Sequence, residues 1–248
     1  MAFRLYFWYN QPNMFIKISS LTLAIFMFFV LFGSRQHPYM FAAAVFGLIL
    51  ATLAINFKRL NFTWPHLLLP ILYILAAAGV FALIPNPAWQ IMFLVLSSVL
   101  FFLMEIRLGK ESHLLQNIYL LSAFGLFLSL FASEFYFRMP LYYFVPAVFV
   151  VSFILAIQGF TGFVLPAKKY FYLLLSLACA EAAWGLAYWP THFFVGAVVL
   201  FCVFYILWLF SFSAFFGKLS RAKIFWQLSL VGIILMVTLA TAAWKPLS

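Results

Sequence analysis

Long apolar stretches, separated by short polar segments, run along almost the whole chain. Because a membrane-crossing helix needs about 20 apolar residues, this pattern predicts nine transmembrane helices. We place them at residues 15–33, 38–57, 65–84, 88–106, 114–137, 141–163, 169–189, 192–216 and 223–244. Pro70 would either kink the third helix or mark a later start for it. No connecting segment is long enough for a soluble domain, so we expect one all-α integral membrane domain over residues 1–248.

Two parts of the chain are near-copies of each other. The matching stretches are LSLFASE and LSLACAE, at residues 128–134 and 175–181, and PLYYFVPAVFVVS and PTHFFVGAVVLFC, at residues 140–152 and 190–202. Their spacing predicts a duplicated two-helix hairpin, residues 114–163 and 169–216, repeated in the same orientation. Weaker matches extend the repeat to residues 15–57 and 65–106, and residues 223–244 are left as a final helix.

The composition also favours a membrane protein. Hydrophobic residues make up 68% of the 248 residues and charged residues 7%, whereas soluble domains carry about 25% charged residues. A soluble fold could not bury this much apolar surface, so we expect the lipid bilayer to surround the chain. The N-terminal segment lacks the cleavage site of a signal peptide, which predicts an uncleaved anchor after an interfacial aromatic stretch at residues 3–9.

The basic residues predict the orientation of the helices. The net charge is +10, but no cluster of four or more Lys and Arg indicates nucleic acid as a partner. If the nine helices alternate in direction, one side of the membrane has only Arg35, Arg138 and Lys245, and the other has the remaining eleven of the 14 Lys and Arg. Because cytoplasmic loops carry the excess of basic residues, we expect the N-terminus inside and the C-terminus outside.

Glu181 is the main candidate for a functional group within the membrane. It follows Lys169 by 12 residues and precedes Pro190 by nine, so a rise of about 1.5 Å per residue places it near the middle of the bilayer. A charged side chain there costs about 2.5–3.5 kcal/mol, so Glu181 must face protein or water or be protonated. With Trp184 and Tyr188 it forms a candidate polar site for a proton, a cation or a headgroup. Alternatively, Glu181 is a hydrogen-bonded structural residue.

Glu134 holds the matching position in the other copy of the repeat, but it lies only six residues before Pro140. It is therefore expected closer to the outer interface than Glu181. Arg138 is four residues further on, at the spacing of a helical ion pair, and a local Glu134–Arg138 pair is the favoured interpretation. With His192 in the next outer turn, these two residues form a candidate group at the outer interface.

The other titratable residues do not converge in the predicted topology. Glu105 and Glu111 are expected in a charged loop at the inner interface, with a structural role. The histidines divide between outer turns and inner helix ends. An outer pair, His37 and His192, could bind a metal with Glu134 or Glu181 if the turns converge, but interfacial histidines are the simpler interpretation.

The chain lacks the motifs of several enzyme classes. It has no phosphate-binding glycine-rich loop, no GxGxxG, no HExxH and no GxSxG. It has no Asp, which removes the paired aspartates that magnesium-dependent lipid transferases usually need. We therefore predict no catalytic residue, no cofactor and no resident metal, and the sequence does not favour an enzyme.

The segments EAAWGLAYWP, GKLSRAKIFWQLSL and a last helix ending in AAW carry a family resemblance over residues 181–244. This part of the chain resembles uncharacterised polytopic membrane proteins of candidate-phylum bacteria. The resemblance implies a bacterial inner membrane and no particular activity.

Three functions remain open on the sequence. The favoured one is a non-enzymatic scaffold or partner subunit of a membrane assembly, with a membrane-protein partner or a second copy of the chain. The second is a small transporter or lipid-handling protein that uses Glu181. The third is an intramembrane enzyme that acts on a lipid-linked substrate with Glu134, Glu181 or His192.

Overall fold

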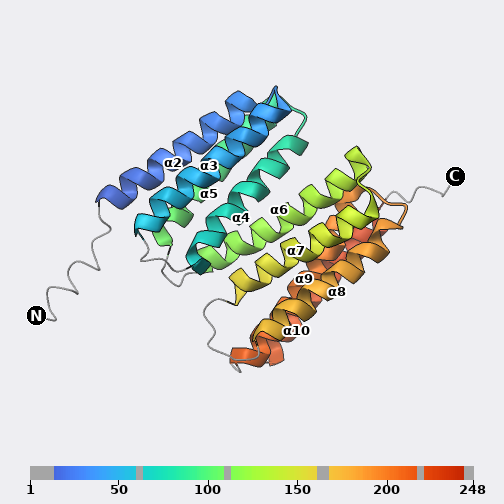
Figure 1. The fold of residues 1–248 in the computed structure, drawn as a ribbon. Helices are drawn as coiled ribbons and strands as arrows, with labels where there is room; N and C mark the ends of the chain where they lie inside the picture. The colour runs from blue at the N-terminus through green and yellow to red at the C-terminus, as the bar shows by residue number, and fades with distance from the viewer. Residues whose placement is uncertain (1–13, 60–63, 109–112, 161–167, 217–220, 243–248) are drawn as a thin grey trace, which may run out of the picture. The chain divides into compact units, whose positions relative to one another are not determined.

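The computed structural model describes residues 14–59, 64–108, 113–160, 168–216 and 221–242, which form nine α-helices and no strand (Figure 1). The helices are α2 Met14–Ser34, α3 Pro38–Arg59, α4 Trp64–Leu83, α5 Pro87–Arg107, α6 His113–Phe137, α7 Leu141–Gly159, α8 Lys168–Ala187, α9 Phe193–Phe216 and α10 Arg221–Ala240. The nine predicted helices are therefore confirmed as helices, although α7 ends four residues earlier than expected. The predicted interfacial stretch at residues 3–9 lies outside the described residues.

Seven of these helices are long and apolar enough to cross a membrane, namely α2, α3, α5, α6, α7, α8 and α9. This is the composition of a multi-pass membrane protein. The apolar parts of α4 and α10, Leu67–Leu83 and Ile224–Ala240, are shorter. Each of these two parts has 17 residues, which is about the minimum length of a membrane-spanning helix.

Prolines lie at or just before the start of several helices. Proline is tolerated in the first helical turn, because an N–H there has no acceptor within the helix. Pro38 and Pro87 are the first residues of α3 and α5, and Pro140 precedes α7. The side chain of Asn86 also caps α5 by accepting a hydrogen bond from the Ala88 N–H at 2.9 Å. Pro70 lies inside α4, which begins at Trp64, so the later start considered for this helix is wrong.

The chain divides into two compact units, residues 1–119 and 120–248, with the boundary inside α6. In the first unit, α2 packs on α3 and α5, and α4 also packs on α3 and α5, so the four helices form a closed bundle (Figure 1). Arg35 at the end of α2 donates a hydrogen bond to the Gln90 side chain of α5 at 3.3 Å. Tyr73 of α4 donates to the Ser97 carbonyl of α5 at 2.8 Å.

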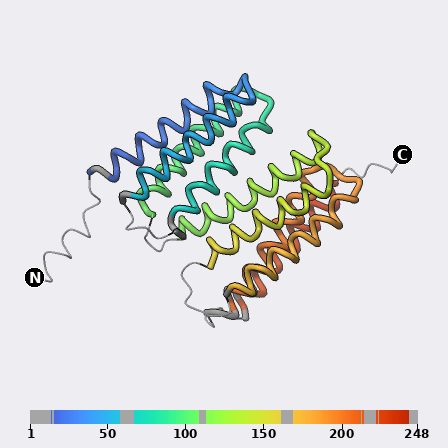
Figure 2. The backbone as a smooth tube through the Cα atoms, in the orientation of Figure 1, coloured from blue at the N-terminus to red at the C-terminus, as the bar shows by residue number. Residues whose placement is uncertain are grey.

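In the second unit, the most extensive contact joins α7 and α8, and α9 packs on both α8 and α10 (Figure 2). Small buried side chains occupy the α7 and α8 faces, including Ser152 and Ala156 on α7 and Ser176, Cys179 and Ala183 on α8. Small residues let helix backbones approach closely, which is the main source of helix association in lipid.

Phenylalanine rings join α6 to its neighbours in the second unit. Phe127 meets Phe204 of α9 with ring centroids 5.5 Å apart, and Phe131 meets Phe144 of α7 at 5.1 Å. The Phe131 ring also covers Gly196 of α9, where an added Cβ would lie 2.6 Å from Phe131 Cε1. Gly196 is therefore required by close packing.

We expect Gly196→Ala to destabilise the second unit by about 1–3 kcal/mol, because the methyl group forces the Phe131 ring out of its position. Thermal unfolding of the purified protein in detergent measures the effect.

The matched control is Gly232→Ala in α10, because an added Cβ at Gly232 meets nothing within 4 Å. Alanine has a higher helix propensity than glycine, so this variant should be neutral or slightly stabilised. Equal melting temperatures for the two variants would contradict the packing assigned to Gly196.

Candidate functional site

The three glutamates in the described part of the chain have three different environments. Glu105 is fully buried, Glu134 is half-buried and Glu181 is exposed. Glu111 lies outside the described residues. These environments decide which of the carboxyl groups are available to a ligand or a partner.

The sequence predicts Glu105 in a charged loop at the inner interface. In the structure it lies inside α5 instead. It is fully buried, and its Oε1 accepts a hydrogen bond from Asn56 Nδ2 of α3 at 3.0 Å. This pair was not predicted from the sequence, because charges near predicted helix ends are expected at the interface. A usable signal was present: Asn56 is an amide within an apolar stretch, two residues before Lys58.

Ser20 of α2 lies at the same level of the bundle as Glu105. The hydrogen bond between Arg35 and Gln90 marks a level that α2 and α5 share. Ser20 lies 15 residues before Arg35, and Glu105 lies 15 residues after Gln90 on the antiparallel helix. Ser20, Asn56 and Glu105 are all fully buried. Three helices therefore bring buried polar groups to one level, which fixes their register, since a polar group without a partner is costly in an apolar interior.

Glu181 lies on the face of α8 that no other helix of the described second unit covers. The buried residues Cys179, Ala180 and Ala183 turn towards the neighbouring helices. The opposite stripe of α8 is exposed and consists of Tyr170, Leu173, Leu174, Leu177, Glu181, Trp184, Gly185 and Tyr188. We call this stripe the Glu181 face.

The three residues proposed as a polar site, Glu181, Trp184 and Tyr188, all lie on the Glu181 face. The rings of Trp184 and Tyr188 contact each other edge to face, with centroids 6.4 Å apart. Trp184 is 56% exposed and Tyr188 62%. Gly185 adds open backbone beside them, because a Cβ there would meet nothing within 4 Å. The site is thus a surface and not a cavity within the second unit.

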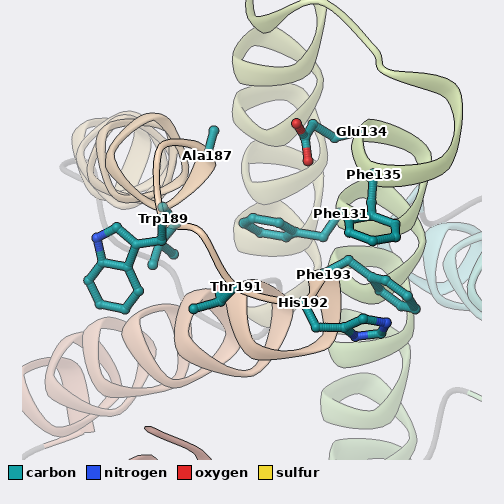
Figure 3. Close-up of a pocket in the computed structure, with 10 residues that line it drawn as sticks. Phe131, Glu134, Phe135, Ala187, Trp189, Thr191, His192 and Phe193 are labelled. Atoms are coloured by element: carbon teal, nitrogen blue, oxygen red, sulfur yellow. The ribbon is translucent and has the colours of Figure 1, made fainter. Parts of the chain in front are cut away.

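Glu134 lies in a recess at the ends of α6 and α8 and the start of α9 (Figure 3). The recess has an empty volume of about 260 Å³, which includes the space at its mouth. Glu134 and Phe131 of α6 point into the space beside Ala187, at the end of α8 (Figure 3). Phe135 and Phe193 form an aromatic wall, with ring centroids 5.5 Å apart.

His192 also lines this recess and caps the start of α9. Its Nδ1 accepts a hydrogen bond from the Phe194 N–H at 3.4 Å. In a neutral imidazole, one ring nitrogen accepts and the other carries the proton. This contact therefore leaves the proton on Nε2, where it is available as a donor, and Phe135 packs on the ring with centroids 5.3 Å apart.

Arg138 does not form the local ion pair expected with Glu134. The helix α6 ends at Phe137, and Arg138 adopts a positive φ of 50°. The i,i+4 geometry of a helical pair requires both residues to continue the helix, so the chain reversal at Arg138 separates the two side chains. Within the described residues, Glu134 and His192 share the recess, while Arg138 is not among its lining residues.

No group of three or more His, Cys, Asp or Glu side chains gathers in a metal-binding arrangement within the described ranges. His37 belongs to the first unit and His192 to the second. The oxygen and nitrogen groups of the recess are thus a carboxylate and an imidazole among aromatic rings. Such a site can accept hydrogen bonds from a cation and donate one to an anion.

The buried pair predicts a coupled effect on stability. Removing one partner leaves the other poorly satisfied, so Asn56→Leu and Glu105→Leu should each lower the free energy of unfolding by about 1–3 kcal/mol. The double variant should lose less than the sum, because neither polar group is then left in the apolar interior. Thermal unfolding in detergent measures this double-mutant cycle, and strictly additive losses would show that the two side chains do not interact.

Comparison with known proteins adds a family but no activity. The family DUF5656, described as proteins of unknown function, matches residues 11–242. Neither the curated proteins nor the solved structures contain a match to this chain. The matched region covers every helix of the described structure. The chain therefore belongs to the DUF5656 family.

Proposed function

We propose that this chain is a non-enzymatic partner subunit of a membrane assembly and that the Glu181 face binds a helix of the partner. The observation that carries the proposal is the exposed Glu181 on a membrane-spanning helix. Within the described residues, its carboxyl group makes no hydrogen bond or ion pair. The face that carries it is otherwise apolar and aromatic.

The depth of Glu181 makes this exposure costly. It lies about 18 Å along the helix from Lys169 and about 9 Å from Ala187, at a rise of about 1.5 Å per residue. A charged side chain near the middle of the bilayer costs about 2.5–3.5 kcal/mol. Protonation removes the charge but leaves a polar group without a partner in hydrocarbon. A partner that donates hydrogen bonds to the carboxyl would remove this cost.

The chemistry of the face favours a different protein over a second copy of this chain. Every Lys and Arg in the described helices lies in a first or last turn, such as Lys17, Arg107 and Lys169. The described helices of a second copy therefore offer no basic side chain at the depth of Glu181. We propose a partner helix that carries a basic or hydrogen-bond-donating side chain there, and Gly185 permits its close approach.

The same proposal includes the topology and location. We propose nine membrane-spanning helices with tandem hairpin repeats, in a bacterial inner membrane, with the N-terminus inside and the C-terminus outside. The distribution of basic residues supports the orientation. The turns that contain Pro140 and Pro190 support the repeat, because each joins the two helices of a hairpin whose first helix carries the matching glutamate.

The two alternatives fit the geometry less well. A transporter or lipid-handling protein that uses Glu181 needs this residue in a cavity, but the described recess contains Glu134 instead. An enzyme that combines Glu134, Glu181 and His192 needs all three in one pocket, and Glu181 is not among the residues that line the recess.

Cysteine labelling tests whether α4 crosses the membrane. The two native cysteines, Cys179 and Cys202, are buried, so introduced cysteines dominate the reaction. A membrane-impermeant maleimide should label Gln36→Cys in intact cells and His113→Cys only after lysis. If α4 does not cross, His113→Cys would also be labelled in intact cells, because the direction of α5 would reverse.

Site-specific photo-cross-linking tests the Glu181 face. A photoreactive residue in place of Trp184 should give a discrete adduct with one other membrane protein in native membranes. The same residue in place of Met236, an exposed position on α10, should give no discrete adduct. Glu181→Leu should abolish the adduct, because the partner then loses its hydrogen-bond acceptor.

Glu134→Leu is the matched control, since it removes a carboxyl that is not on the Glu181 face, and it should leave the adduct unchanged. An adduct that survives Glu181→Leu would contradict the proposed interface. An adduct of twice the mass of the chain would show that a second copy, and not a different protein, covers the face.

A further inference from the structure

The recess around Glu134 is separate from the Glu181 face, and the proposed interface does not use it. Glu134 comes from the last turn of α6, and the other walls come from the end of α8 and the start of α9. Its carboxyl group is half-buried and has no hydrogen-bond partner within the described residues. A half-buried carboxylate favours an occupant that brings both a positive charge and hydrogen-bond donors.

Aromatic rings narrow the class of that occupant. Phe131 extends beside Glu134, and Phe135 and Phe193 form the wall opposite (Figure 3). The faces of aromatic rings attract ammonium groups, and carboxylates do so more strongly. A carboxylate placed among phenylalanine rings therefore fits an alkylammonium group better than a bare metal ion, for which no group of three or more ligands is assembled among the described residues.

His192 adds a donor to the same recess. Its Nδ1 is engaged by the Phe194 N–H, so Nε2–H is the ring group left to donate a hydrogen bond to a ligand. A ligand that matches both groups carries an ammonium for Glu134 and an anionic oxygen for His192. We propose that the recess binds the headgroup of phosphatidylethanolamine, with its ammonium at Glu134 and its phosphate at His192.

The size and depth of the recess fit a headgroup. Its enclosed part is about 20 Å³, which is room for about one water-sized group, so the ammonium group would enter it and the phosphate and acyl chains would remain at its mouth. Glu134 lies three residues before the end of α6, which is about 5 Å along the helix axis. That level is where the hydrocarbon meets the headgroups.

The Phe131 wall of the recess is held by packing against two other helices. Gly196 lies beneath the Phe131 ring, and Phe144 of α7 packs against the same ring with centroids 5.1 Å apart. The ring beside Glu134 is therefore held in place from two other helices. Pre-organised walls reduce the entropy lost when a ligand binds.

Native mass spectrometry of the purified full chain in mild detergent tests the proposal. The probes are dihexanoyl phosphatidylethanolamine and dihexanoyl phosphatidylglycerol, which share the phosphate and acyl chains but differ in the ammonium group. We expect the wild type to bind phosphatidylethanolamine about tenfold more tightly, because the charge-assisted bond to Glu134 needs the ammonium. Glu134→Gln keeps the shape of the side chain and should reduce this preference to near parity.

Glu181→Gln is the matched control, because it removes the other exposed or half-exposed glutamate of the described residues and should keep the preference. His192→Ala should weaken both lipids together, since both carry the phosphate. Equal binding of the two lipids by the wild type would overturn the proposal, and so would a preference that survives Glu134→Gln. A preference lost equally in Glu181→Gln would assign the ammonium to the Glu181 face.

Discussion

The structure depends on one constraint, which is that a polar group in hydrocarbon has no water to bind. Backbone groups meet this constraint within helices, and the described residues form nine of them. Side-chain carboxyls must meet it through another partner. Of the three described glutamates, Glu105 does so by binding Asn56. Glu134, in a recess near a helix end, and Glu181, which faces outwards from α8, have no hydrogen-bond partner within the described residues. Their environments separate structural acids from acids that remain available for binding.

Small residues decide how the second unit packs. In lipid, helices associate through close packing and not through the exclusion of water, and α8 turns Ser176, Cys179 and Ala183 towards its neighbours. Because these small residues face the neighbouring helices, Glu181 lies on the other side of α8. Packing and exposure are therefore linked, since the face that is best suited to contact α7 cannot also carry the carboxyl. The outward position of Glu181 follows from the inward position of the small residues.

Two similar stretches of sequence, residues 128–134 and 175–181, reach different environments. The helix α6 ends three residues after Glu134, whereas α8 continues for six residues after Glu181. Three more residues are about 4.5 Å along the helix axis, so Glu181 lies further from the end of its helix than Glu134 does. The matching glutamates therefore support different proposals, a lipid headgroup at Glu134 and a protein partner at Glu181.

The sequence by itself predicted a lipid environment, the nine helices and the positions of Glu134 and Glu181 along their helices, because these depend on the length and composition of apolar segments, but it assigned Glu105 to a loop. It also predicted Glu181, Trp184 and Tyr188 as one group, since their spacing follows the helical repeat. Only the tertiary structure decided which face of each helix is buried, that Asn56 reaches Glu105, and that Arg138 leaves the helix. The physical reason is that lipid and protein interior are similarly apolar, so helices that are hydrophobic on all sides carry no periodic signal of their buried face.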